Sequence, residues 1–123
     1  MQIDAEGRRQ SGKAACEVIM DILYDRSGKT LKVSLRGELD ESSAAAVRES
    51  LDRNILLSDA GRVIFDLSRL SFMDSSGIGV LVGRYKKFVK RSVGFFISSP
   101  NPTVDKILKL SGIYTIMPEV ETA

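Results

Sequence analysis

The chain has 123 residues, of which 43% are apolar and 28% are charged, and its 18 basic and 16 acidic side chains leave a net charge of +2. This size and composition predict a single globular domain. The near-balance of charge argues against nucleic acid as a partner, because binding to a phosphate backbone shows as a strong, clustered positive excess. Apolar runs are too short to span a bilayer, and charged residues interrupt any N-terminal signal segment, so we expect a cytoplasmic protein with no membrane partner.

The inventory of reactive side chains disfavours catalysis. The sequence contains no histidine, and Cys16 is its only cysteine. Ser-His-Asp and Cys-His catalysis are therefore absent, an internal disulfide is impossible, and a thiolate metal cluster is not expected. A carboxylate-only magnesium site stays open, but we expect neither a cofactor nor a metal, and no enzymatic activity.

The first part of the chain changes from a tail to a hairpin. Residues 1–14 are polar and aperiodic, which predicts a flexible N-terminal tail before a domain of residues 15–123. Residues 16–24 read as a strand, a polar turn with Gly28 follows, and residues 31–39 alternate apolar and polar side chains. Two strands joined by a short polar turn predict an antiparallel hairpin.

The remainder of the chain alternates between helix and strand patterns. After residue 40, four apolar residues recur at helical spacing, namely Ala44, Val47, Leu51 and Ile55. Ser42 and Ser43 are candidate N-caps, and Gly61 is a stop signal. Residues 62–68 and 93–98 are short apolar runs that predict buried strands. Residues 76–91 predict a second helix, with Gly79 and Gly83 allowing close packing on the sheet. Residues 101–112 predict a third helix, and residues 113–117 a last short strand.

This order, β-β-α-β-α-β-α-(β), predicts an α/β domain with a mixed β-sheet of four to five strands and helices packed on it. The two buried strands should be parallel neighbours joined by right-handed crossovers. In such sheets functional groups gather where strands end and loops enter helices. Two loops qualify, residues 37–43 ("GELDESS") and residues 70–77 ("LSFMDSSG").

The second loop has two interpretations. Asp74 or Ser75 could cap the following helix by accepting hydrogen bonds from its free backbone N–H groups. Alternatively, one hydroxyl is a phosphoacceptor, because a helix N-terminus partly accommodates the charge of about −1.5 to −2 that a phosphoserine carries. Beside Asp74, and Asp66 or Asp40, such a phosphate would make a strongly negative surface and act on binding rather than on folding.

The stretch "LSFMDSSGIGVLVGRYK", together with "GELD" before a Ser/Ala-rich helix start, resembles the bacterial anti-sigma factor antagonists of the STAS domain family. The resemblance covers roughly residues 17–117. It implies a STAS-type fold and a protein that, when unphosphorylated, binds an anti-sigma factor that is also a serine kinase and so frees the sigma factor. It further implies inactivation by that kinase and reactivation by a serine phosphatase.

Carried over by position, the resemblance assigns particular residues. The phosphorylated serine would be Ser75, directly after the motif's aspartate. Partner-binding positions would follow from the flanking motif and from the acidic loop: Glu38, Asp40, Asp74, Ser76 and Gly77. Many relatives continue into a further C-terminal helix for which this chain has too few residues, and its N-terminal tail is longer than the family minimum.

Other readings stay open. A STAS scaffold or regulatory subunit of a larger signalling assembly would have the same fold. An aspartyl-phosphate receiver would use Asp66, but it needs an acidic pair after its first strand, where this chain has only Asp21 and Asp25 in a hairpin.

The basic run of residues 84–91 predicts a solvated helix face or a patch that steers an acidic partner. We expect a monomer or a weak dimer.

Overall fold

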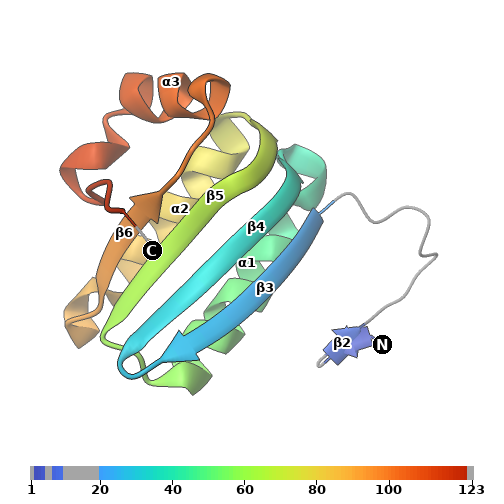
Figure 1. Ribbon diagram of the computed structural model, residues 1–123, viewed down its shortest axis with the longest axis vertical. Coiled ribbons are helices and arrows are strands. Elements are labelled where there is room, and N and C mark those ends of the chain that lie inside the picture. The colour runs from blue at the N-terminus through green and yellow to red at the C-terminus, as the bar shows by residue number, and fades with distance from the viewer. Residues whose placement is uncertain (1, 5–6, 10–19, 122–123) are drawn as a thin grey trace.

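The computed structural model describes residues 2–4, 7–9 and 20–121, and its main feature is a four-stranded mixed sheet (Figure 1). The strands are β3 (Met20–Ser27), β4 (Thr30–Leu39), β5 (Arg62–Met73) and β6 (Gly94–Ser98), in the order β3-β4-β5-β6. β3 and β4 form the predicted antiparallel hairpin, and the pairs β4–β5 and β5–β6 are parallel. The predicted α/β class and mixed sheet are confirmed.

The two long helices cover the same face of this sheet. α1 (Glu41–Ser58) and α2 (Ser75–Phe88) lie side by side behind the strands in Figure 1, and α3 (Pro102–Ser111) lies at the end of the sheet near β5 and β6. Two short 3-10 turns follow α2 and α3, namely η2 (Val89–Arg91) and η3 (Ile113–Thr115). None of the helices in the described part of the chain is long and apolar enough to cross a membrane.

Most of the predicted tail lies outside the described residues. Its described parts, β1 (Gln2–Asp4) and β2 (Gly7–Arg9), pair with each other as a separate antiparallel sheet. The domain boundary at residue 14, and the predicted strand start at Cys16, also fall among residues that the structure does not describe.

The core lies between the sheet and the helices. The helical stripe predicted for α1 is confirmed, because all four of its members are buried: Ala44, Val47, Leu51 and Ile55. They pack with the alternate residues of β4 and with β5 in one continuous cluster. Burial of this apolar surface is the main stabilising contribution, about 25 cal/mol for each Å² removed from water.

Several sequence-based element boundaries were wrong. β5 continues past the predicted end at residue 68 to Met73, and the predicted last strand at residues 113–117 contains the 3-10 turn η3 instead. The chain returns to the sheet only after this turn, through a parallel bridge between Ile97 and Glu119. The N-cap of α1 is Asp40 rather than Ser42 or Ser43.

The basic run of residues 84–91 is not a uniformly solvated face. Arg84 is buried against α1, with its Nε 2.7 Å from Oδ1 of Asp52, while Lys87 reaches the second oxygen of Asp52 at 3.0 Å. The exposed basic side chains of the run are Lys86, Lys87, Lys90 and Arg91. Burial makes the Arg84–Asp52 pair part of the α1–α2 contact.

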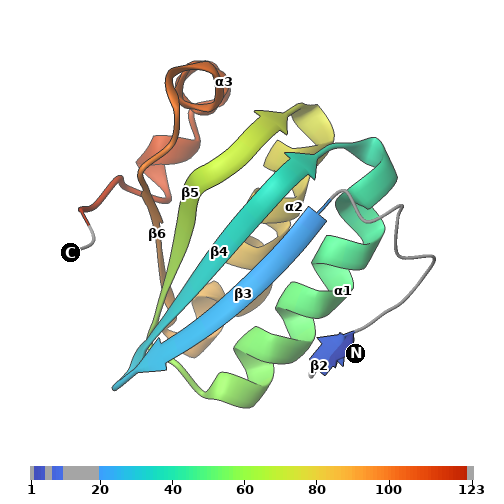
Figure 2. The ribbon, with the colours of Figure 1, turned by 45° about the vertical axis from the view of Figure 1, so that its right-hand side comes forward.

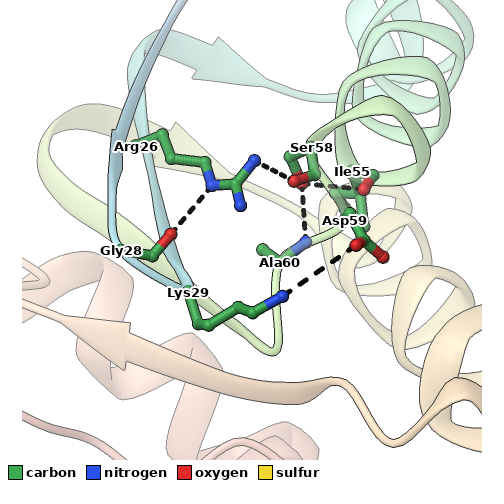
Figure 3. Close-up of polar contacts among 7 residues, drawn as sticks. All are labelled: Arg26, Gly28, Lys29, Ile55, Ser58, Asp59 and Ala60. Carbon is green, nitrogen blue, oxygen red and sulfur yellow. Dashed lines mark hydrogen bonds and ion pairs between the residues drawn. The ribbon is translucent and has the colours of Figure 1, made fainter.

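The far end of α1 is tied to the β3–β4 hairpin (Figure 3). Arg26 donates from Nη1 to the carbonyl oxygen of Ser58 and from Nε to that of Gly28. α1 has no basic residue in its own last turn, so the hairpin supplies the positive charge that the C-terminal end of a helix favours. Lys29 adds an exposed ion pair with Asp59 at 3.9 Å. These contacts join the C-terminal end of α1 to the turn between β3 and β4.

The near end of α2 is held by the close approach of Gly77 to the sheet. A Cβ at this position would lie 2.7 Å from Cγ of Met73, 2.8 Å from the carbonyl oxygen of Leu39 and 3.0 Å from Cγ of Leu39. The first two distances are shorter than real Cβ contacts, and the second is to the backbone of β4, which cannot move aside as a flexible side chain can, so glycine is favoured here. Gly79 and Gly83, for which we predicted this role, have nothing within 4 Å of such a Cβ.

We predict that Gly77→Ala destabilises the protein by about 1–3 kcal/mol, because the added methyl group overpacks against the backbone of β4. Gly79→Ala on the same helix is the matched control, and it should stabilise the protein by up to about 1 kcal/mol through helix propensity. Urea unfolding followed by circular dichroism measures both. Equal stability of the two variants would contradict the close-packing role of Gly77.

Candidate partner-binding site

Two strand-to-helix turns lie side by side at the carboxyl end of the parallel strands. Leu39 at the end of β4 pairs with Met73 at the end of β5, so Asp40 and Asp74 leave the sheet in register. The backbone N–H of Asp74 also donates to the carbonyl oxygen of Leu39 at 3.4 Å. The N-termini of α1 and α2 therefore meet at one edge, as Figure 2 shows.

Asp40 caps α1 through a dense set of hydrogen bonds. Its Oδ1 accepts from the hydroxyl of Ser42 at 2.6 Å and from the backbone N–H groups of Ser42 and Ser43 at 2.9 and 3.2 Å. The Ser43 hydroxyl accepts from the backbone N–H of Asp40 and donates to the carbonyl oxygen of Glu38, which completes a capping box. The Ser42 hydroxyl and the N–H donors hold the pKa of Asp40 below its usual value. This carboxylate is a fixed negative charge.

Asp74 caps α2 in the same way. Its Oδ1 accepts from the backbone N–H of Ser76 at 2.8 Å and from that of Gly77 at 3.3 Å. The cap leaves Ser75 as the first residue of α2, exposed to solvent. Within residues 2–4, 7–9 and 20–121, no hydrogen bond engages the Ser75 hydroxyl. Ser76 is half-buried, and Gly77 is buried against the sheet.

We call the end of the sheet where α1 and α2 begin the tip. Glu38 and Phe72 lie at this tip, on the face of the sheet opposite to α1 and α2. These two residues are cross-strand partners on β4 and β5, and both are exposed, Phe72 to 42%. Phe72 was missed from the sequence because we ended the strand at residue 68. The sequence holds one signal: an apolar Met73 directly before the candidate cap Asp74 suggests that the strand extends to residue 73, and alternation then places Phe72 on its other face.

The structure brings the six sequence-predicted site residues together at this tip, but not Asp66. Asp66 pairs with Ser34 and Ser98 in mid-sheet, eight residues and roughly 25 Å of strand before Asp74. Its carboxylate lies 3.7 Å from Nζ of Lys32 and accepts from the backbone N–H of Ser68. Asp66 therefore adds no charge to the tip. It also does not end a strand, which removes the feature that suggested a receiver domain.

The cap and the charge of Asp74 can be separated by substitution. We predict that Asp74→Ala costs about 1 kcal/mol of stability, because the two N–H groups lose their acceptor, while Asp74→Asn keeps the cap and most of the stability. Chemical denaturation of the three proteins at neutral pH measures the difference. A loss in the asparagine variant as large as in the alanine variant would show that charge, not capping, is the stabilising contribution.

Comparison with known proteins gives consistent matches. The family model for the STAS domain matches residues 21–123. An anti-sigma F factor antagonist from Paenibacillus polymyxa is 39% identical over 88 residues, which are 72% of this chain and 75% of that protein.

Two solved structures show the same fold. The anti-sigma factor antagonist SpoIIAA in its unphosphorylated form aligns with a TM-score of 0.70 at 29% identity, covering 81% of this chain and 88% of that one. The Bacillus cell fate determinant SpoIIAA in its phosphorylated form aligns with a TM-score of 0.63 at 28% identity, covering 81% and 91%. With the family model matching most of its length, this chain belongs to the STAS domain family.

Proposed function

We propose that this protein is a bacterial anti-sigma factor antagonist, a regulatory binding protein of the cytoplasm rather than an enzyme. In its unphosphorylated form it binds an anti-sigma factor that is also a serine kinase, and so frees the sigma factor. The kinase switches it off by phosphorylating Ser75, and a serine phosphatase restores it. The relatives named as antagonists of anti-sigma factors support the first step, and the geometry of the α2 N-terminus supports the second.

The observation that carries the proposal is the position of Ser75. Its hydroxyl is exposed at the first residue of α2, and within the described ranges no hydrogen bond holds it. A kinase can therefore reach it without unfolding the helix. Ser76 is the less accessible hydroxyl, because it is half-buried and its own backbone N–H is part of the cap.

A phosphate at this position acts on binding more than on folding. At the first turn of a helix the dipole favours negative charge, which offsets part of the cost of the modification. The tip already carries the exposed or half-exposed carboxyl groups of Glu38, Asp40, Glu41 and Asp74. A further charge of about −1.5 to −2 makes it repel acidic surfaces, and the added group fills the space that a closely packed partner needs.

The other predicted residues have separate roles in this proposal. Glu38, Asp40 and Asp74 present negative charge to basic side chains of the anti-sigma factor. Ser76 and Gly77 act through the backbone, because their N–H groups fix the Asp74 carboxylate and the start of α2. A partner would therefore meet a preorganised surface, which lowers the entropic cost of binding.

The phosphorylation site is tested by labelling the purified protein with its anti-sigma factor kinase, identified by co-purification and mass spectrometry. With magnesium ATP the wild-type chain should gain one phosphate at Ser75, and Ser75→Ala should gain none, because it lacks the acceptor hydroxyl. Ser76→Ala is the matched control and should still be labelled. Undiminished labelling of the Ser75→Ala variant would overturn the assignment.

The charge mechanism is tested by affinity rather than by labelling. Ser75→Asp should fold normally, since aspartate is favourable in a first helical turn, but bind the anti-sigma factor at least about tenfold more weakly. Ser75→Asn, which is similar in size but neutral, should retain more of the affinity. Isothermal calorimetry gives the three constants. Equal values for the aspartate and asparagine variants would refute repulsion by charge.

A further inference from the structure

Phe72 is a large aromatic side chain that the fold turns away from the core. Its neighbour Met73 is fully buried on the helix side of the sheet, against Gly77. Successive side chains of a strand point to opposite faces. Phe72 therefore projects from the face that α1 and α2 do not cover, beside its cross-strand partner Glu38.

A β-bulge creates this arrangement. Gly37 pairs with Leu70 and Glu38 pairs with Phe72, so Ser71 is an extra residue on β5. The Ser71 hydroxyl donates to the carbonyl oxygen of Gly37 at 2.9 Å, and Gly37 has the positive φ of 115° that favours glycine. If β5 alternated strictly after Leu70, Phe72 would lie on the helix side of the sheet and Met73 on the other face. The bulge thus fixes the direction of Phe72.

In the described part of the chain, the pairing of the two outer strands does not reach this position. The described pairing of β3 begins at Met20, opposite Gly37, and the pairing of β6 ends at Ser98, opposite Asp66. Among the described residues, β4 and β5 alone continue to the tip. Within residues 2–4, 7–9 and 20–121, Phe72 is 42% exposed.

We infer that Phe72 is the apolar anchor of the surface that binds the anti-sigma factor, an inference that rests on the proposed function. Phe72 precedes Ser75 by three residues, at most about 11 Å along the chain. A typical interface covers 20–30 residues on each side, which is large enough to extend from Ser75 around the end of the sheet to Phe72. Exposed aromatic side chains at the centre of such surfaces contribute much of the binding free energy.

The surroundings of Phe72 define the chemistry of the partner surface. Glu38 is the cross-strand partner of Phe72, and Asp40 and Asp74 follow on the adjacent turns. A complementary surface has an apolar pocket for the phenyl ring and a rim of arginine or lysine side chains. Phe72 supplies affinity by burial, whereas the rim carboxylates supply attraction at a distance.

The test compares Phe72→Ala with wild type for binding to the anti-sigma factor that co-purifies with the wild-type chain. We expect at least about 30-fold weaker binding. Surface plasmon resonance should show the loss as faster dissociation with an unchanged salt dependence of association. Glu38→Gln should instead slow association and flatten its salt dependence.

Two further variants keep the test decisive. Phe72→Thr introduces a β-branched residue suited to a strand, so it guards against a folding defect in the alanine variant, and it should lose the same affinity. Leu110→Ala removes a similarly apolar side chain, 79% exposed on α3, and should bind like wild type. Thermal unfolding confirms that all variants fold.

The outcomes separate the two proposals. If the wild-type chain captures no anti-sigma factor, the proposed function fails, and the role of Phe72 fails with it. If the wild-type chain binds and the two Phe72 variants bind equally well, the proposed function stands and the anchor is refuted. Loss of affinity in both Phe72 variants but not in Leu110→Ala supports the anchor.

Discussion

The contact between Gly77 and the ends of β4 and β5 determines the geometry of the whole tip. Because α2 starts with no side chain against Leu39 and Met73, its first turn lies directly on the two parallel strands. The register of those strands then places the caps Asp40 and Asp74 side by side. A helix displaced outward by one methyl group would carry Ser75 away from the acidic turn of α1. The chemistry of the site thus depends on a residue with no functional group.

β5 shows how a strand can depart from strict alternation and remain buried. Leu67, Leu70 and Met73 are all fully buried, although they are three residues apart. The register against β4 shifts twice in this stretch, and each shift inserts one residue that restores the apolar side chain to the helix face. The inserted residues keep the core continuous to the tip, and the second insertion turns Phe72 outward.

These bulges explain which parts of the structure could be predicted. The hairpin, the stripe of α1 and the bounds of α3 follow local periodicity and helix start and stop signals, and all three are confirmed. The end of β5 could not be predicted by alternation, because the bulges break the period of two at Ser68. Likewise, the burial of Arg84 depends on Asp52, 32 residues earlier, and the role of Gly77 depends on Leu39. Contacts so distant in sequence leave no local pattern.

Capping and switching can share one helix terminus because they use different atoms. The Asp74 carboxylate satisfies the backbone N–H groups of Ser76 and Gly77, so the helix does not need the hydroxyl of Ser75. That hydroxyl stays exposed, and a charge added to it meets a favourable helix dipole. If Ser75 were itself the cap, its modification would remove a stabilising hydrogen bond and act on folding. With aspartate as the cap, the same position can change its surface charge while the fold is retained.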